Sequence, residues 1–141
     1  MDMIDKKLIA CLQANSREPT SVLARKLGLS RSTVQDRISR LEDSHIIGGY
    51  TIRFNEDYDR RRIRAHVMIA ISPKLSDRIV HTLKQMLAVK SLYAVSGQHD
   101  LIAVLEADTT NEIDKALDDI GRIPGIEKTM SSIVLSTKLE R

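Results

Sequence analysis

Apolar residues in the first 45 positions recur every three or four residues, which is the spacing of one face of an α-helix. This pattern predicts three short helices over residues 3–14, 21–27 and 31–43. Gly28 follows the second helix, where a left-handed residue commonly ends a helix, and Ser30 offers a cap for the third. The residues expected to share a core are Ile4, Leu8, Cys11, Leu12, Leu23, Ala24, Leu27, Val34, Ile38 and Leu41.

The third predicted helix carries a polar, mostly basic side opposite its apolar side. A short helix, a tight turn containing glycine and a basic second helix are typical of a helix-turn-helix. Such a motif places the N-terminal part of its second helix in the DNA major groove. The alternative is that these are ordinary surface residues of a helical domain. The side chains concerned are Arg31, Ser32, Thr33, Gln35, Asp36, Arg37 and Arg40.

The segment after Gly48-Gly49 predicts a short exit strand over residues 50–54. Residues 55–62 are polar and show no periodicity, so they are expected to form a linker. The linker ends in three consecutive arginines, residues 60–62. We expect these arginines to be solvated, with contact to the DNA backbone as the alternative.

Beyond the linker, strand-like and helix-like patterns alternate. Four residues, Gly97 to Asp100, separate two apolar runs and suit an antiparallel hairpin. Thr109 and Glu112 form a capping box that opens the second helix. The predicted order is a strand over 64–72, a helix over 75–88, strands over 91–96 and 100–107, a helix from 110 and a strand over 127–136, with Ile79, Leu83, Met86, Leu87, Ile113, Leu117 and Ile120 facing the core.

The order strand, helix, strand, strand, helix, strand repeats one unit twice, which is the ferredoxin-like βαββαβ arrangement. The predicted fold class is therefore α+β. We expect a winged-type helix-turn-helix domain over residues 1–54, a linker over 55–62 and a ferredoxin-like domain over 63–141.

Charge supports this division. The 141 residues carry a net charge of +3, and all of it lies in residues 1–62, which hold 12 Lys/Arg and 9 Asp/Glu; residues 63–141 hold 10 of each. A basic cluster beside a neutral remainder is a common feature of DNA-binding proteins. No apolar run exceeds five residues and the acidic start is unlike an export signal, so we expect a soluble, cytoplasmic protein without a membrane partner. The single cysteine, Cys11, is compatible with a reducing compartment.

Taken together and in order, five motifs resemble the leucine-responsive regulatory protein/AsnC family, the feast/famine transcriptional regulators. They are Ile4-Asp5-Lys6-Lys7-Leu8-Ile9, the stretch Leu23 to Ser30, Arg40-Leu41-Glu42 followed by Ile46 to Tyr50, Val95 to Asp100, and Ile123-Pro124-Gly125-Ile126 with Thr129-Met130-Ser131. The resemblance implies a regulator that pairs through the sheets of its second domains. It also implies that a small molecule, typically an amino acid, binds between neighbouring second domains. A homodimer, and from it a ring of four dimers, is expected.

DNA contacts follow from the helix geometry. Ser32, Thr33 and Gln35 can exchange hydrogen bonds with base edges, and Arg31 or Arg37 can bind a guanine in bidentate fashion. Phosphate contacts are expected from Arg25, Lys26 and Arg40. Ser30, at the start of the helix, is also expected to be a DNA-binding residue. Asp36 is expected to pair with Arg40 at the i+4 spacing and to hold it in place. We expect alanine at Arg37 or Arg40 to weaken DNA binding and to leave the fold intact.

Effector contacts are expected in the loop Gly97, Gln98, His99 and Asp100, and at Thr129 and Ser131. Asp100 would accept an α-ammonium group, and the two hydroxyls, which share one strand face, would donate to a carboxylate. The alternatives are that Asp100 caps a turn and that the hydroxyls are ordinary sheet-surface groups. For His99 we favour an exposed loop position over a ligand contact or a pH switch.

Two other functional classes remain open. Siroheme decarboxylases resemble this fold family, but the stretch before Gly97 lacks their expected His-rich pattern, and no metal or cofactor motif is present. We therefore expect no enzyme, no cofactor and no metal site. The remaining alternative is a DNA-organising protein without an effector.

Overall fold

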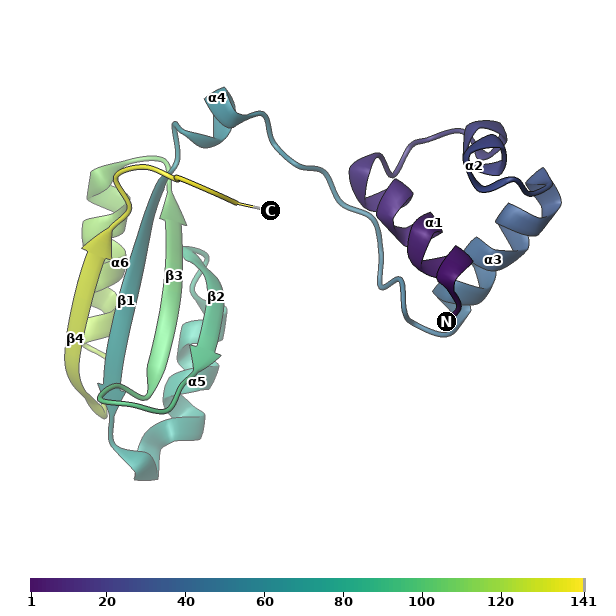
Figure 1. Cartoon of the computed structure of the whole chain (residues 1–141). Coiled ribbons are helices and arrows are strands. Elements are labelled where there is room, and N and C mark those ends of the chain that lie inside the picture. Colours follow the sequence, from purple (N-terminus) through teal and green to yellow (C-terminus); the bar gives the residue numbers. More distant parts are fainter. Residues whose placement is uncertain (141) are drawn as a thin grey trace. The chain divides into compact units, whose positions relative to one another are not determined.

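The computed structural model describes residues 1–140, which form two compact units divided after Arg53 (Figure 1). Helices are the only regular elements of the first unit, and the second contains one sheet, two longer helices and a short helix near its start. Each unit has its own hydrophobic core, and the two cores share no residue.

Three helices make up the first unit: α1 (Met3–Ala14), α2 (Thr20–Leu27) and α3 (Arg31–Asp43). These bounds confirm the predicted helices to within one residue. Leu8, Leu23 and Val34, one from each helix, are almost completely buried and hold the helices together. The helix-turn-helix is therefore formed by α2 and α3.

The turn between α2 and α3 has the predicted chemistry. Gly28 adopts the left-handed conformation with φ 66°, and the following Leu29 N–H donates to the Ala24 carbonyl at 2.9 Å. Ser30 caps α3 because its hydroxyl accepts a hydrogen bond from the Thr33 N–H. These two caps fix where α2 ends and where α3 begins.

The predicted exit strand over residues 50–54 is wrong for the single chain. Residues 48–55 carry no helix or strand, and Tyr50 instead donates its hydroxyl hydrogen to Glu42 at 2.7 Å. A strand needs a neighbour to satisfy its backbone groups, and the described part of the first unit contains no other strand.

The expected linker contains a short helix, α4 (Glu56–Asp59), capped by the side chain of Asn55. Its sequence is polar and has no apolar periodicity, which is why the pattern of residues 55–62 predicts an irregular segment instead. Arg62 then leads directly into the first strand of the second unit.

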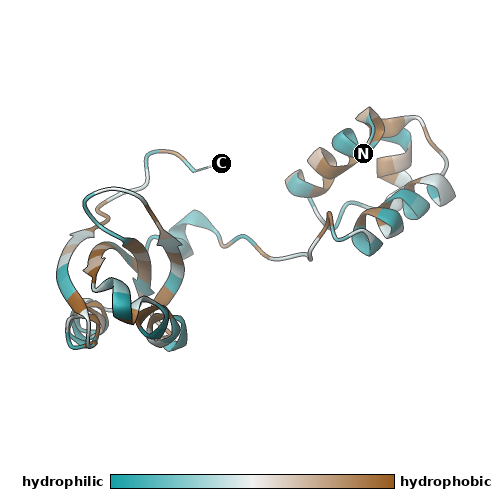
Figure 2. Ribbon diagram, turned by 90° about the horizontal axis from the view of Figure 1, so that it is seen from below, coloured by the Kyte–Doolittle hydropathy of each residue, from teal (hydrophilic) through white to brown (hydrophobic). Residues whose placement is uncertain are grey.

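The second unit has the predicted βαββαβ order, with a short 3-10 turn before its first helix. Its elements are β1 (Ile63–Ile71), η1 (Pro73–Leu75), α5 (Ser76–Gln85), β2 (Val89–Ala94), β3 (Leu101–Ala107), α6 (Thr110–Gly121) and β4 (Ile126–Ile133). The four strands form an antiparallel sheet in the order β2-β3-β1-β4. Both helices cover the same face of this sheet and leave the other face open (Figures 1 and 2).

The core of the second unit lies between the sheet and these two helices. Alternate residues of β1 and β3 face the helices, as the period of two in a strand requires. The completely buried side chains are Ala65, Val67, Ile69, Ala103 and Leu105 from the strands and Ile79, Leu83 and Ile120 from the helices.

Two details of the predicted core are wrong. The helix predicted over 75–88 ends at Gln85, because Met86 turns to an extended conformation so that the chain can enter β2. Leu87 therefore lies in the connection and is 92% exposed, instead of facing the core. In α6, Leu117 packs against the core as predicted, although it is only partly buried, and Ala116, which was not predicted, is buried as well.

Candidate nucleic-acid interface and effector loop

Helix α3 presents an apolar side to its own unit and a polar side to solvent. Val34, Ile38 and Leu41 are buried against α1 and α2. On the polar side, four of the predicted DNA-binding residues are exposed, namely Arg31, Ser32, Gln35 and Arg40. Within the first unit, α3 therefore presents exposed polar and basic side chains on the side opposite its buried residues.

Three hydroxyl groups gather where α3 begins. The Ser30 hydroxyl bonds to the Thr33 hydroxyl at 2.7 Å and to the Ser32 hydroxyl at 3.2 Å. Since Ser30 also accepts from the Thr33 N–H, Ser30 and Thr33 shape the first turn of the helix. Ser30 and Ser32 are exposed, whereas Thr33 is half-buried.

Arg37 is bound within the chain. Its Nη1 donates to Asp2 Oδ2 and to Asp5 Oδ1, both at 2.8 Å, and only 18% of its side chain is exposed. The Asp5 N–H and the Arg37 guanidinium lower the pKa of Asp2 to about 2, and Arg37 also lowers the pKa of Asp5. Both carboxylates raise the pKa of Arg37 in return, Asp2 most strongly. Arg37 thus connects α3 to the start of α1.

Arg40 also approaches this acidic pair. Its Nη2 lies 3.7 Å from Asp5 Oδ1, and two thirds of the side chain remains exposed. The predicted i+4 pair between Asp36 and Arg40 is wrong, because Arg40 turns toward α1 instead. Asp2 and Asp5 were missed as partners of α3. The only sequence signal for them is the pair of acids at the start of α1, which forms a capping box.

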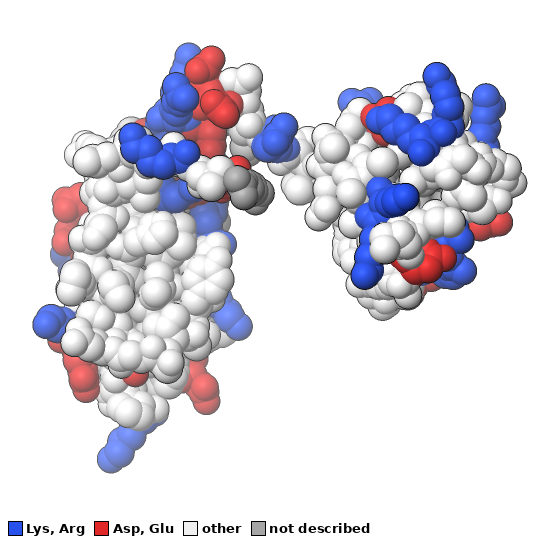
Figure 3. All heavy atoms as spheres, in the orientation of Figure 1, with Lys and Arg blue, Asp and Glu red and all other residues white. Residues whose placement is uncertain are grey.

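Two further predicted phosphate ligands lie in the last turn of α2. Lys26 Nζ is 3.3 Å from Glu18 Oε1 and is half-exposed. Arg25 is exposed, and no ion pair involving it occurs within residues 1–140. The space-filling view shows Lys and Arg side chains standing out over the first unit (Figure 3).

The predicted effector loop follows β2 and leads into β3. Gly97 has φ 153°, a value that side-chain-bearing residues rarely adopt, and Gln98 is exposed. Asp100 Oδ2 accepts a hydrogen bond from the Ile71 N–H at 2.8 Å, and the Asp100 N–H donates to the Ile69 carbonyl at 2.9 Å. One carboxylate oxygen of Asp100 therefore fastens the loop to the end of β1.

His99 lies inside this loop but is not exposed. Only 6% of its surface is accessible, which corrects the expectation of an exposed residue. The physical reason is the anchoring of the next residue, since Asp100 holds the loop against the end of β1 and folds His99 inward.

Thr129 and Ser131 lie on β4, on the same face as Ile69 and Val67, their partners on β1. The effector loop borders the opposite edge of β1, next to the Ile69–Leu101 pair of β1 and β3. Two strand spacings, about 10 Å, therefore separate Thr129 from the start of β3. Within one chain the loop and the two hydroxyls flank β1 from opposite sides.

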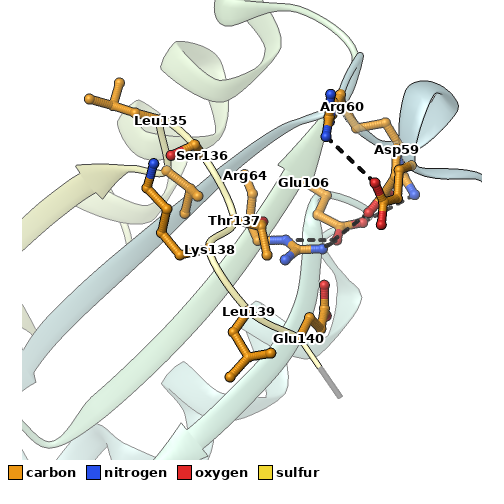
Figure 4. Close-up of a pocket in the computed structure, with 13 residues that line it drawn as sticks. Asp59, Arg60, Arg64, Glu106, Leu135, Ser136, Thr137, Lys138, Leu139 and Glu140 are labelled. Carbon is orange, nitrogen blue, oxygen red and sulfur yellow. Dashed lines mark hydrogen bonds and ion pairs between the residues drawn. The ribbon is translucent and has the colours of Figure 1, made fainter.

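A groove of about 750 Å³ lies where α4, β1, β3 and residues 134–140 meet (Figure 4). Glu106 at its wall binds two arginines, Arg62 at 3.1 Å and Arg64 at 3.0 Å. Arg64 also lies 3.9 Å from Asp59, which connects α4 to the sheet. Of the arginine run 60–62, Arg62 is thus folded onto the second unit, and Arg60 lies 3.5 Å from Glu56. The partners of Arg62 and Arg64 were missed because Glu106 is more than 40 residues distant.

The open face of the sheet is uncharged at its centre. Met68 of β1 pairs with Ile102 of β3 on one side and Met130 of β4 on the other, and Tyr93 of β2 follows next to Ile102. Met68, Met130 and Tyr93 are exposed. Figure 3 shows this face as a field of uncharged residues bordered by Lys, Arg, Asp and Glu.

No group of three or more His, Cys, Asp or Glu side chains within residues 1–140 has the geometry to hold a metal ion. Cys11 is a free thiol packed at the edge of the first core. None of the helices among these residues combines the length and the apolar character needed to cross a bilayer.

Comparison with known protein families gives two matches in chain order. Residues 1–42 match the AsnC-type helix-turn-helix domain, and residues 64–141 match the Lrp/AsnC ligand binding domain. The second match alone covers more than half of the chain.

Among curated proteins, the chain is similar to HTH-type transcriptional regulators of archaea. It is 28% identical to regulator FL11 of Pyrococcus horikoshii over 99% of this chain and 93% of the relative. It is 32% identical to regulator LrpA of the same organism, covering 96% of each, and 31% identical to regulator LysM of Sulfurisphaera tokodaii, covering 96% and 95%.

Solved structures share the fold over the full length. Escherichia coli AsnC superposes with a TM-score of 0.91 at 22% identity, covering all of this chain and 96% of that one. The L-Met complex of the Neisseria meningitidis transcriptional regulator NMB0573 gives a TM-score of 0.90 at 22% identity, covering 99% and 93%.

Proposed function

The chain belongs to the Lrp/AsnC family of transcriptional regulators, and from that premise we propose how its two units divide the work of DNA binding and effector sensing. It is a DNA-binding regulator with a helix-turn-helix domain and a ligand-binding domain. Our proposal adds which side chains contact DNA, which contact the effector and how copies of the chain associate. It includes no catalytic role, cofactor or metal, and it places the protein in the cytoplasm, where the DNA of its archaeal relatives lies.

The proposed DNA-binding surface is the exposed side of α3 together with the last turn of α2. Arg31, Ser32 and Gln35 contact base edges, because they are exposed in the first two turns of α3, the part of a recognition helix that enters deepest. Arg25, Lys26 and Arg40 contact phosphates. Ser30 and Thr33 contribute by shaping the first turn of the helix, and Arg37 by positioning the helix.

The observation that carries this proposal is the free, basic side of α3 opposite its buried apolar side. Fluorescence anisotropy on DNA selected from a random duplex pool tests it. Arg31→Ala is expected to weaken binding to the selected site more than to unrelated DNA. Arg40→Ala is expected to weaken binding to both equally and to reduce the salt dependence by about one counterion. Lys128→Ala on β4, which removes the same charge from the second unit, is the control. Unchanged affinity in both first-unit variants would contradict the proposal.

The proposed effector is an amino acid, the class to which the L-Met of the N. meningitidis structural relative belongs. Gly97, Gln98, His99 and Asp100 would form one wall of the site and Thr129 and Ser131 another. Asp100 keeps one carboxylate oxygen beside the one that binds Ile71, and that oxygen would accept the α-ammonium group. Because β1 separates the two walls, a ligand touching both sets would lie between neighbouring copies of the second unit.

A thermal-shift screen with the twenty amino acids tests for this effector. A ligand that binds only the folded state raises Tm. At a ligand concentration of 100 times Kd it stabilises the folded state by about 2.7 kcal/mol. Asp100→Asn, which keeps an acceptor for Ile71, should abolish the shift, whereas Asp108→Asn should not. A screen in which no amino acid raises Tm would favour the DNA-organising alternative.

The proposed assembly is a homodimer formed through the open sheet face, with a ring of four dimers as the larger form. An effector bound between copies can change DNA affinity only by favouring one assembly or one spacing of the recognition helices. Two-fold pairing would also bring two α3 helices to successive major grooves, about one helical turn apart.

A further inference from the structure

Asp36 occupies the centre of the DNA-facing side of α3. Val34, Ile38 and Leu41 point into the core. Successive residues of a helix are rotated by about 100°, so Ser32 and Asp36 lie on the side opposite to these three residues. Ser39 and Asp43 continue this side toward the end of the helix. Asp36 is exposed and is the sixth residue of the helix, so it lies in the part of α3 that would face base edges.

The carboxylate of Asp36 takes no part in the ion pairs formed by the neighbouring arginines of α3. Arg40, at the spacing that would pair with Asp36, approaches Asp5 instead, and Arg37 is bound to Asp2 and Asp5. Within residues 1–140, no ion pair and no side-chain hydrogen bond involves Asp36. Asp36 therefore carries an unpaired negative charge among the basic side chains of the first two turns of α3, and Asp43 is a second carboxylate farther along the same side.

A free carboxylate on this surface is repelled by phosphates unless it accepts a hydrogen bond from DNA. The major groove offers two amino donors, N4 of cytosine and N6 of adenine. Adenine places its N7 acceptor beside N6, and this acceptor repels a carboxylate, whereas side chains with both a donor and an acceptor fit it. Cytosine N4 is the donor that Asp and Glu match.

We propose that Asp36 is a specificity-determining residue that reads a cytosine through its N4 amino group. This inference rests on the proposed DNA-binding function of α3 and deepens it. Asp36 contributes little to affinity for unrelated DNA, because the phosphate repulsion remains there without a compensating hydrogen bond. It contributes to the preference for one G·C pair in each half-site.

The experiment measures binding of the full chain to a selected site and to variants of that site with every single base-pair change, at one fixed salt concentration. Asp36→Ala is expected to lose about tenfold of the preference at one G·C pair and to keep the other preferences. Asp36→Asn is expected to prefer A·T at the same position, because an amide matches N6 and N7 of adenine. Asp43→Asn removes the same charge from the same side of α3, about 10 Å further along, and should leave every preference unchanged.

Circular dichroism and Tm establish that the variants fold, and Asp36, which is exposed, makes no side-chain hydrogen bond or ion pair within residues 1–140. The inference is overturned if Asp36→Ala binds all sequences more tightly with an unchanged pattern of preferences, since Asp36 then only repels phosphates. It is also overturned if the wild-type protein binds DNA without any base preference. A wild-type protein that binds no DNA at low salt overturns the proposed function instead, which separates the two failures.

Discussion

At the scale of single residues, Arg37 shows where sequence reasoning reaches its limit. Its place on the basic side of α3 predicted a contact with a guanine base, and the helical spacing indicated Asp36 as the partner of Arg40. The structure joins Arg37 to two acids more than 30 residues away, at the start of α1. Spacing within one helix is visible in a sequence, whereas contacts between helices depend on how they pack. His99 was misjudged because its loop is held against the distant end of β1 by Asp100, and Leu87 because α5 ends two residues before it.

We expect Arg37→Met, which keeps the length of the side chain but removes its charge, to lower the Tm of the first unit by several degrees. Loss of Arg37 leaves Asp5, which is nearly buried, without its principal partner. The sequence alone led us to expect that alanine at Arg37 leaves the fold intact, whereas the contacts of Arg37 with Asp2 and Asp5 lead us to expect a loss of stability. Hydrogen exchange of the α1 and α3 amides measures the first unit separately. Arg31→Met is the matched control and should leave exchange unchanged.

The same residues predict an acid dependence. Asp2 and Asp5 have pKa values lowered in the folded state, Asp2 to about 2, whereas an unfolded aspartate titrates at about 3.9. Their contribution to stability is complete above about pH 4 and is lost as the pH falls toward 2. In Arg37→Met this dependence should be shallower between pH 4 and 2. Equal acid dependence in both proteins would contradict the role given to Arg37.

At the scale of elements, the sequence pattern predicted the helices well, because residues close in sequence cap them. The three helices of the first unit are capped by neighbours in sequence, such as Gly28 and Ser30, and their bounds were predicted closely. The order of strands and helices along the second unit and its hairpin were predicted as well. The strand over 50–54 was not, because a strand is completed by a partner that no local pattern supplies. The second arm of the predicted capping box also differs, since Glu112 accepts from the Asp108 N–H and not from Thr109.

The turn from α6 into β4 gives a prediction at this scale. Gly125 has φ 95°, and a Cβ added there would lie 2.8 Å from Leu75 Cδ1 and 2.9 Å from Leu75 Cβ. Gly125→Ala should destabilise the second unit by about 1–3 kcal/mol, because Leu75 is packed against the core and cannot yield freely. Gly121→Ala at the end of α6 meets nothing within 4 Å and should be neutral or slightly stabilising. Urea unfolding monitored by circular dichroism compares the two, and equal midpoints would contradict this account.

At the scale of the whole molecule, charge and apolar surface are separated between the units. All of the net charge of +3 lies in residues 1–62, on the side of the chain that carries the helix-turn-helix. The second unit is neutral and keeps the centre of its open sheet face free of charge (Figure 3). The sequence predicted the first of these features from composition alone. The second required the sheet order, because Met68, Ile102 and Met130 become neighbours only through strand pairing.

This separation leads to a prediction about assembly. Met68 is 36% exposed and lies at the centre of the open face, between Ile102 and Met130. In a dimer formed through that face, Met68→Glu would place a carboxylate from each copy in a desolvated interface, at a cost of several kcal/mol for each unpaired charge. Sedimentation velocity at micromolar concentration should then show the wild type as a dimer or larger and the variant as a monomer. Leu87→Glu, on an exposed connection between α5 and β2, should assemble like the wild type.

The monomeric variant should also bind DNA more weakly. A monomer binds one half-site with one recognition helix and lacks the raised effective concentration that pairing gives the second helix. A monomeric wild type would refute the homodimer, and a Met68→Glu protein that still assembles would place the interface on another surface.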